Sequence, residues 1–132
     1  MKQKQTIFLV VLLVCFCLMT FAGKALASGT WYYYDVTVPK HGGTNSTNNQ
    51  TKQYNENHSI NCSWVGGDYD LWAYLQLVDN TTVSDLKLIN DNMYISWPNT
   101  ASAGQKVHMT FKSAWYDHVH IESVGYWSPD TP

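Results

Sequence analysis

The sequence has 132 residues, with eight lysines, no arginine and ten acidic residues, and its formal net charge is −2. This length suits one domain with a short extension rather than two domains. Because nucleic-acid affinity depends on basic side chains that neutralise phosphates, an acidic chain without arginine is a poor candidate for a nucleic-acid partner.

The N-terminal segment has the three parts of a secretory signal. Lys2 and Lys4 are followed by 13 consecutive apolar residues over 7–19, and small residues occupy 25–27. A membrane-spanning helix needs about 20 apolar residues, so this run is short for one. The pattern predicts a signal peptide over 1–27 that is removed on secretion. An uncleaved membrane anchor is the alternative.

Removal of the signal leaves 28–132 as a secreted, extracellular domain without a membrane span. Five lysines then remain beside ten acidic residues, which gives a formal charge of −5. Cys62 becomes the single cysteine, so no intrachain disulfide can form. Since Cys62 alternates with Ile60 and Trp64, we expect a buried core thiol. An intermolecular bridge or a reactive thiol is the alternative.

The rest of the domain shows a two-residue alternation of apolar and polar side chains. In the clearest case the inward-facing side chains are Val107, Met109, Phe111 and Trp115, and they alternate with His108, Thr110 and Lys112. Such alternation is typical of half-buried strands, and turn-forming residues separate the segments. The chain therefore predicts an all-β fold, a single antiparallel β-sandwich of about seven strands. The predicted strands cover 31–38, 59–65, 70–78, 83–89, 92–97, 105–115 and 118–127.

The stretch 40–57 does not fit this pattern. It is rich in Asn, Thr and Gly, and Tyr54 is its one large apolar residue. Burial of so little apolar surface does not offset an ordering cost of roughly 1–2 kcal/mol per residue. The sequence predicts a flexible polar loop here, and a packed lid is the alternative.

The strongest candidate for a metal site is the set of His118, His120 and Glu122. On a strand, alternate residues project from one face about 6.5–7 Å apart. Two imidazoles and a carboxylate could hold zinc or another divalent ion, and a metal-dependent hydrolase using His118 and His120 is the corresponding function. The polar outer face of an amphipathic strand explains the same pattern without a metal. We expect no cofactor.

Aromatic residues beyond the needs of a core are the main functional signal. Exposed rings form platforms for sugar stacking or anchors for a protein partner. An edge strand whose second face packs under the polar loop would also explain the run that begins at Trp31. No Gly-x-Ser-x-Gly, His-Glu-x-x-His or phosphate-loop motif occurs, so we expect a binding protein and not an enzyme. The candidate binding residues are Trp31, Tyr33, Trp72, Tyr74 and Trp127.

The tail Gly125-Tyr126-Trp127-Ser128-Pro129-Asp130 follows an Asn/Thr-rich first third and a tryptophan-containing strand. This arrangement resembles a group of small secreted β-domain proteins of Gram-positive bacteria, of unknown function, some of them associated with bacteriocin-type gene clusters. The resemblance implies a secreted effector, such as a bacteriocin-like toxin, or its accessory or immunity protein. The residues themselves favour binding to an extracellular glycan or an envelope protein at the cell surface.

Overall fold

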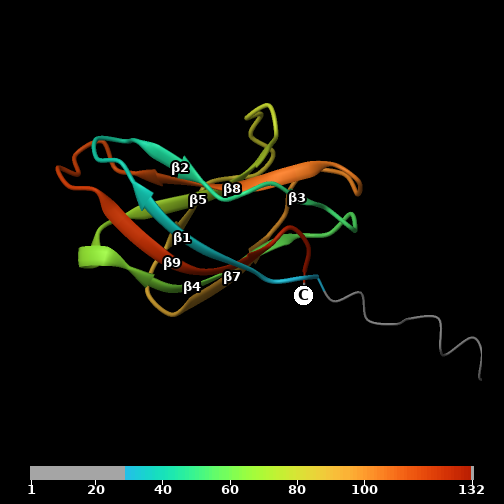
Figure 1. Cartoon of the computed structure of the whole chain (residues 1–132), viewed down its shortest axis with the longest axis horizontal. Coiled ribbons are helices and arrows are strands. Elements are labelled where there is room, and N and C mark those ends of the chain that lie inside the picture. The colour runs from blue at the N-terminus through green and yellow to red at the C-terminus, as the bar shows by residue number, and fades with distance from the viewer. Residues whose placement is uncertain (1–28, 132) are drawn as a thin grey trace, which may run out of the picture.

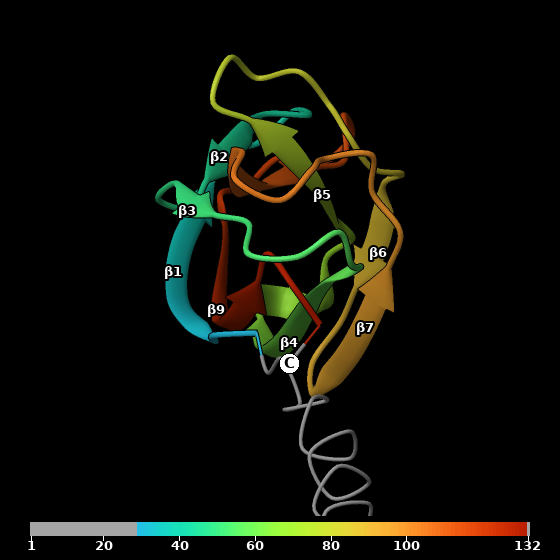
Figure 2. The same ribbon diagram turned by 90° about the vertical axis from the view of Figure 1, so that its right-hand side faces the viewer.

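In the described part of the chain, nine strands form two antiparallel sheets that lie face to face as a sandwich (Figures 1 and 2). The computed structural model describes residues 29–131, so the expected signal peptide over 1–27 lies outside the described residues. The strands are β1 (Tyr32–Val38), β2 (Thr44–Ser46), β3 (Gln50–Thr51), β4 (His58–Val65), β5 (Leu71–Leu77), β6 (Lys87–Ile89), β7 (Met93–Trp97), β8 (Lys106–Ser113) and β9 (Ile121–Ser128). The predicted all-β antiparallel sandwich is confirmed.

The two sheets differ in how their edges are built. One sheet has the order β1-β9-β4-β7, and we call it the four-stranded sheet. The other has the order β2-β8-β5-β6, with β3 also paired to β8, and we call it the five-stranded sheet. The edge strand β1 and the short strands β2 and β3 therefore lie at the same open side of the sandwich, as Figure 2 shows.

The core lies between the sheets and contains the inward-facing residues of the alternating segments. Tyr34 of β1 packs on Phe111 of β8 with ring centroids 4.8 Å apart, and this contact joins the two layers. Cys62 is fully buried in the same core, which confirms the predicted burial of its thiol. Each fully buried large side chain contributes roughly 1.5–3 kcal/mol to folding. The largest apolar ones are Trp127, Phe111, Ile60, Leu71, Leu75, Ile89, Met109 and Ile121.

The one helical element among the described residues is small. The 3-10 helix η1 covers Gly66–Asp68 between β4 and β5, and Gly67 adopts a positive φ of 68° there, which favours glycine. Among residues 29–131, no helix is long and apolar enough to cross a membrane.

The segment 40–57 differs from the expected flexible loop. Its residues form β2 and β3, and both strands pair with β8. Within it Lys52 is 1% exposed, and its Nζ donates hydrogen bonds to the carbonyls of Glu56 and Pro129, each at 2.6 Å, and to Asp130 Oδ1 at 3.2 Å. Pairing with a strand and with the C-terminal tail supplies order that no local apolar residue could supply.

Two further strand boundaries also differ from expectation. Only Lys87–Ile89 of the predicted strand 83–89 forms β6, since Ser84 meets Asn99 in an isolated bridge instead. The last strand begins at Ile121 and not at residue 118. Residues 115–116 form a turn after β8, and 117–120 belong to no strand.

Candidate functional site

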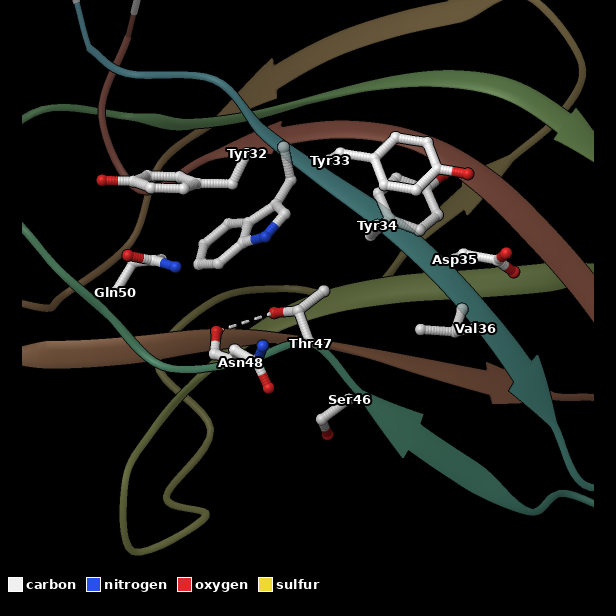
Figure 3. A pocket seen from close by; sticks show the side chains of 10 residues that line it. Tyr32, Tyr33, Tyr34, Asp35, Val36, Ser46, Thr47, Asn48 and Gln50 are labelled. Carbon is white, nitrogen blue, oxygen red and sulfur yellow. Dashed lines mark hydrogen bonds between the residues drawn. The ribbon is translucent and has the colours of Figure 1, made fainter.

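The open side of the sandwich holds a groove between β1 and the β2–β3 segment, which we call the edge groove (Figure 3). Its volume is about 230 Å³. One wall comes from the four-stranded sheet and the other from the five-stranded sheet. The lining residues are Tyr32, Tyr33, Tyr34, Asp35, Val36, Ser46, Thr47, Asn48, Gln50 and Trp127.

Aromatic rings form one side of the edge groove. Alternation along β1 turns Tyr32 and Tyr34 inward and leaves Tyr33 outward, where it is 62% exposed. Tyr32 is half-buried and packs on Trp127 of the neighbouring strand β9, with ring centroids 6.1 Å apart. Trp127 is only 1% exposed, so it supports Tyr32 from beneath. A half-buried aromatic surface therefore faces the groove.

Uncharged polar side chains form the opposite wall, and they come from β2, the turn after it and β3. Figure 3 marks one hydrogen bond among the residues drawn, from the Thr47 hydroxyl to the backbone carbonyl of Asn48 at 3.2 Å. The side-chain amides of Asn48 and Gln50 are therefore not paired with another lining residue. Asp35 is the single formally charged residue of this lining.

The backbone of β1 adds further hydrogen-bonding groups at this edge. Asn45 Nδ2 donates to the Thr37 carbonyl at 3.0 Å, so this carbonyl points away from β9 and toward β2. In an antiparallel ladder alternate residues point to the same side, so the backbone groups of Asp35 and Tyr33 also point toward the groove. The edge groove thus combines an aromatic side with the side-chain amides of Asn48 and Gln50 and with backbone groups of β1.

The outer face of the four-stranded sheet carries a second group of aromatic side chains. Cross-strand pairing places Tyr33, Tyr126, Asn61 and Tyr94 in one row across β1, β9, β4 and β7. The three tyrosines are 62%, 47% and 56% exposed. Trp31 lies beside this row and meets Tyr94 edge-on with centroids 6.1 Å apart. Trp31 and Tyr33 are therefore both on or next to an accessible face.

A larger cleft lies on the five-stranded sheet, and we call it the Trp72 cleft. Its volume is about 620 Å³. Trp72 of β5 is half-buried, and its direct cross-strand partner is Lys112 of β8. The turn after β8 adds Trp115, which is 79% exposed, and Tyr116. The complete lining is His41, Gly42, Trp72, Leu86, Lys112, Ser113, Ala114, Trp115 and Tyr116.

The structure divides the five predicted binding residues. Accessible surface remains on Trp31 and Tyr33, at the outer face of the four-stranded sheet, and on Trp72, in the Trp72 cleft. Tyr74 is only 8% exposed, because it lies in mid-strand beside Thr110, and burial raises its pKa. Trp127 belongs to the core and reaches the edge groove only as its floor. The prediction that Tyr74 and Trp127 present exposed rings is therefore wrong.

The predicted metal set is not assembled as a strand face. His118 and His120 precede β9, so the continuous strand that would align them with Glu122 does not exist. All three residues are exposed, and the ring of His118 packs edge-on against His41 with centroids 5.1 Å apart. Within residues 29–131, no group of three or more His, Cys, Asp or Glu side chains could hold a metal ion.

Some site residues were missed by the sequence reasoning. Residues 46–50 lay in the presumed loop, and only their pairing with β8 brings them to the edge groove. Trp115 was expected to face inward at the end of a strand, but β8 ends at Ser113. Asp117 could have indicated this end, because its carboxylate accepts a hydrogen bond from the Ala114 amide at 3.0 Å and closes a turn.

The fold places this chain among the all-β antiparallel sandwiches. No protein-family model, curated protein or solved structure matches it. The geometry of the surfaces is therefore the basis for a function.

Proposed function

We propose that this chain is a secreted, non-enzymatic protein that acts by binding an extracellular glycan, and that the edge groove holds a neutral sugar unit. One observation carries the proposal: the aromatic side of the groove, Tyr32 over Trp127, faces a polar wall in which the side-chain amides of Asn48 and Gln50 are not paired with another lining residue. A sugar ring offers an apolar C–H face to the former and hydroxyl groups to the latter.

The size of the groove favours a small unit. At about 230 Å³ the groove is smaller than the roughly 300–1,000 Å³ of sites for drug-sized ligands. Its sides remain open to solvent along β1, because Tyr33 at the rim is largely exposed. A terminal or branching sugar of a longer chain fits this arrangement.

The charge of the groove favours a neutral ligand. Asp35 is its single charged residue, and no lysine is among the described residues that line it. Phosphate-bearing and nucleic-acid ligands need positive groups, which this surface does not supply. A carboxylate such as that of Asp35 accepts hydrogen bonds from sugar hydroxyls.

The same lining supports binding rather than hydrolysis. Glycoside hydrolysis generally needs two carboxyl groups that flank the scissile bond. Among the residues that line the edge groove, Asp35 supplies one carboxyl group. The place of action rests on the signal-like segment over 1–27, which directs the domain to the cell envelope or beyond it.

A titration with defined neutral oligosaccharides and soluble cell-wall glycan fragments tests the proposal. Binding is followed by calorimetry and by tryptophan fluorescence, since Trp127 lies at the floor. Gln50→Ala and Tyr32→Ala should each weaken binding about tenfold, which corresponds to about 1.4 kcal/mol. Gln53→Ala, an exposed glutamine outside the groove, is the matched control.

The binding affinities of the variants decide whether the edge groove is the glycan site. Binding that depends on Gln50 but not on Gln53 supports the edge groove. Gln50→Ala is the decisive variant, because its partly exposed side chain is not part of the core. Absence of binding across the whole glycan panel, or binding that is equal in all variants, refutes the proposal.

A further inference from the structure

The Trp72 cleft differs in chemistry from the edge groove. More of its surface is apolar than polar, and its lining includes Trp72, Trp115 and Leu86. Its polar groups are few, and two of them are already engaged: the Tyr116 hydroxyl donates to Asp70 Oδ2 at 2.7 Å and Ser113 Oγ donates to the Pro39 carbonyl at 2.6 Å. A ligand here gains ring contacts rather than many hydrogen bonds.

The aromatic residues of the cleft are held by a rigid turn although they are exposed. The Asp117 carboxylate accepts a hydrogen bond from the Ala114 amide at 3.0 Å, and the Asp117 amide donates one to the Ala114 carbonyl at 3.1 Å. Gly42 also donates its amide to the Ala114 carbonyl at 3.0 Å. Trp115 is thus presented 79% exposed on an ordered backbone, and it adds little to the core. An exposed ring on a rigid support costs little entropy when it binds.

The charge of the cleft is opposite to that of the chain. Lys112 lies directly across from Trp72, and His41 is on the facing loop. None of the described residues that line the cleft is acidic. Two acids lie next to the lining: Asp70 accepts a hydrogen bond from the Tyr116 hydroxyl and Asp117 accepts one from the Ala114 amide. Lys112 is the one formally charged residue of the lining, so an anionic group in the cleft would pair with its ammonium.

We propose that the Trp72 cleft binds a small aromatic carboxylate, with the ring against Trp72 and Trp115 and the carboxylate at the Lys112 ammonium. The volume of about 620 Å³ lies within the range of small-molecule sites. An apolar wall with one cation matches a ligand with one flat ring and one anionic group. This site is separate from the edge groove and does not depend on glycan binding.

A paired-ligand titration tests the proposal. Naphthoate and its uncharged counterpart naphthamide are added to the secreted domain, and binding is followed by nitrogen–proton correlation NMR. We expect naphthoate to shift the signals of Lys112 and Trp115 and to bind about three- to tenfold more tightly than naphthamide, the difference expected for a partly exposed charge pair. Lys112→Gln should remove this preference, and Trp115→Ala should weaken both ligands.

Two control variants make the test specific. Lys106→Gln removes another exposed lysine of β8, and Trp64→Ala removes a tryptophan that is 42% exposed on the other sheet. Both should leave naphthoate binding unchanged. Equal affinity for naphthoate and naphthamide, no naphthoate binding up to its solubility limit, or binding that survives Trp115→Ala overturns the proposal. Tighter binding of galacturonate than of naphthoate also overturns it, since the ligand would then be an acidic sugar.

Discussion

Lys52 and Asp130 are 78 residues apart in the sequence and form an ion pair with Nζ 3.2 Å from Oδ1, both side chains being buried. The same carboxylate accepts hydrogen bonds from the backbone amides of Gln53, at 2.7 Å, and Tyr54, at 3.1 Å. The C-terminal tail is thereby attached to the segment between β3 and β4. Within residues 29–131 Cys62 is the single cysteine and it is free, so this ion pair joins the two segments without a covalent bond.

Removing one member of this pair should destabilise the fold strongly. Asp130→Asn leaves the Lys52 ammonium buried without its counter-charge, and we expect a loss of about 3–5 kcal/mol in the free energy of unfolding. Urea denaturation measures it. Lys106→Met, which removes an exposed lysine, should change the value by less than about 0.5 kcal/mol. Equal effects of the two variants would contradict a stabilising role for the pair.

His58 should make the protein sensitive to acid. Burial, with a smaller contribution from the Lys52 charge, lowers the pKa of its imidazole to about 3 from the usual 6.5. Between these values the unfolded chain binds a proton that the folded protein does not, so stability falls as pH decreases from about 6.5 toward 3. Each unit of separation corresponds to about 1.4 kcal/mol.

The check compares the wild-type protein with His58→Gln by urea denaturation at several pH values from neutral to mildly acidic. The wild-type protein should lose more stability on acidification than the variant does. His120→Gln removes an exposed imidazole, and its profile should follow that of the wild-type protein. Parallel profiles for the wild-type protein and His58→Gln would show that His58 does not control the acid response.

Gly125 should not tolerate a side chain. A Cβ atom at this position of β9 would meet the Asn61 carbonyl oxygen and would lie 3.0 Å from the Cys62 Cα, both of which belong to the backbone of β4. Gly125→Ala should therefore cost roughly 3 kcal/mol. Gly104→Ala is the comparison, since nothing lies within 4 Å and only its φ of 89° is unfavourable, at about 1 kcal/mol. Thermal or urea unfolding that ranks the two in the opposite order would contradict this reading.

The Cys62 thiol should be unreactive in the folded protein. The side chain is fully buried, and its Sγ lies 3.7 Å from Ser123 Oγ inside the core. A thiol reagent that releases a coloured product should modify Cys62 only after the protein is denatured. Ser102→Cys places a thiol at an exposed turn and should react at once under native conditions. Rapid modification of native wild-type protein would show that the core opens readily.

The candidate site was only partly predictable. The sequence has more aromatic residues than its core needs, so some of them had to be exposed. This reasoning predicted the outward positions of Trp31 and Tyr33 and the partial exposure of Trp72. Tyr74 and Trp127 were predicted in the same way and are buried, because the strand pattern does not say how deeply neighbouring strands cover a residue. Trp115 was placed inward, since the end of β8 depends on the turn that Asp117 closes.

The sequence by itself determined the strand class, because the direction of alternate side chains is a local property of an extended backbone. Alternation at positions such as Val107, Met109 and Phe111 therefore predicted both the strands and the layered core. Only the tertiary structure decided that residues 44–51 become β2 and β3, because their order comes from the edge of β8 and from Lys52 on Asp130. Such contacts join distant parts of the chain, and no local pattern of residues encodes them.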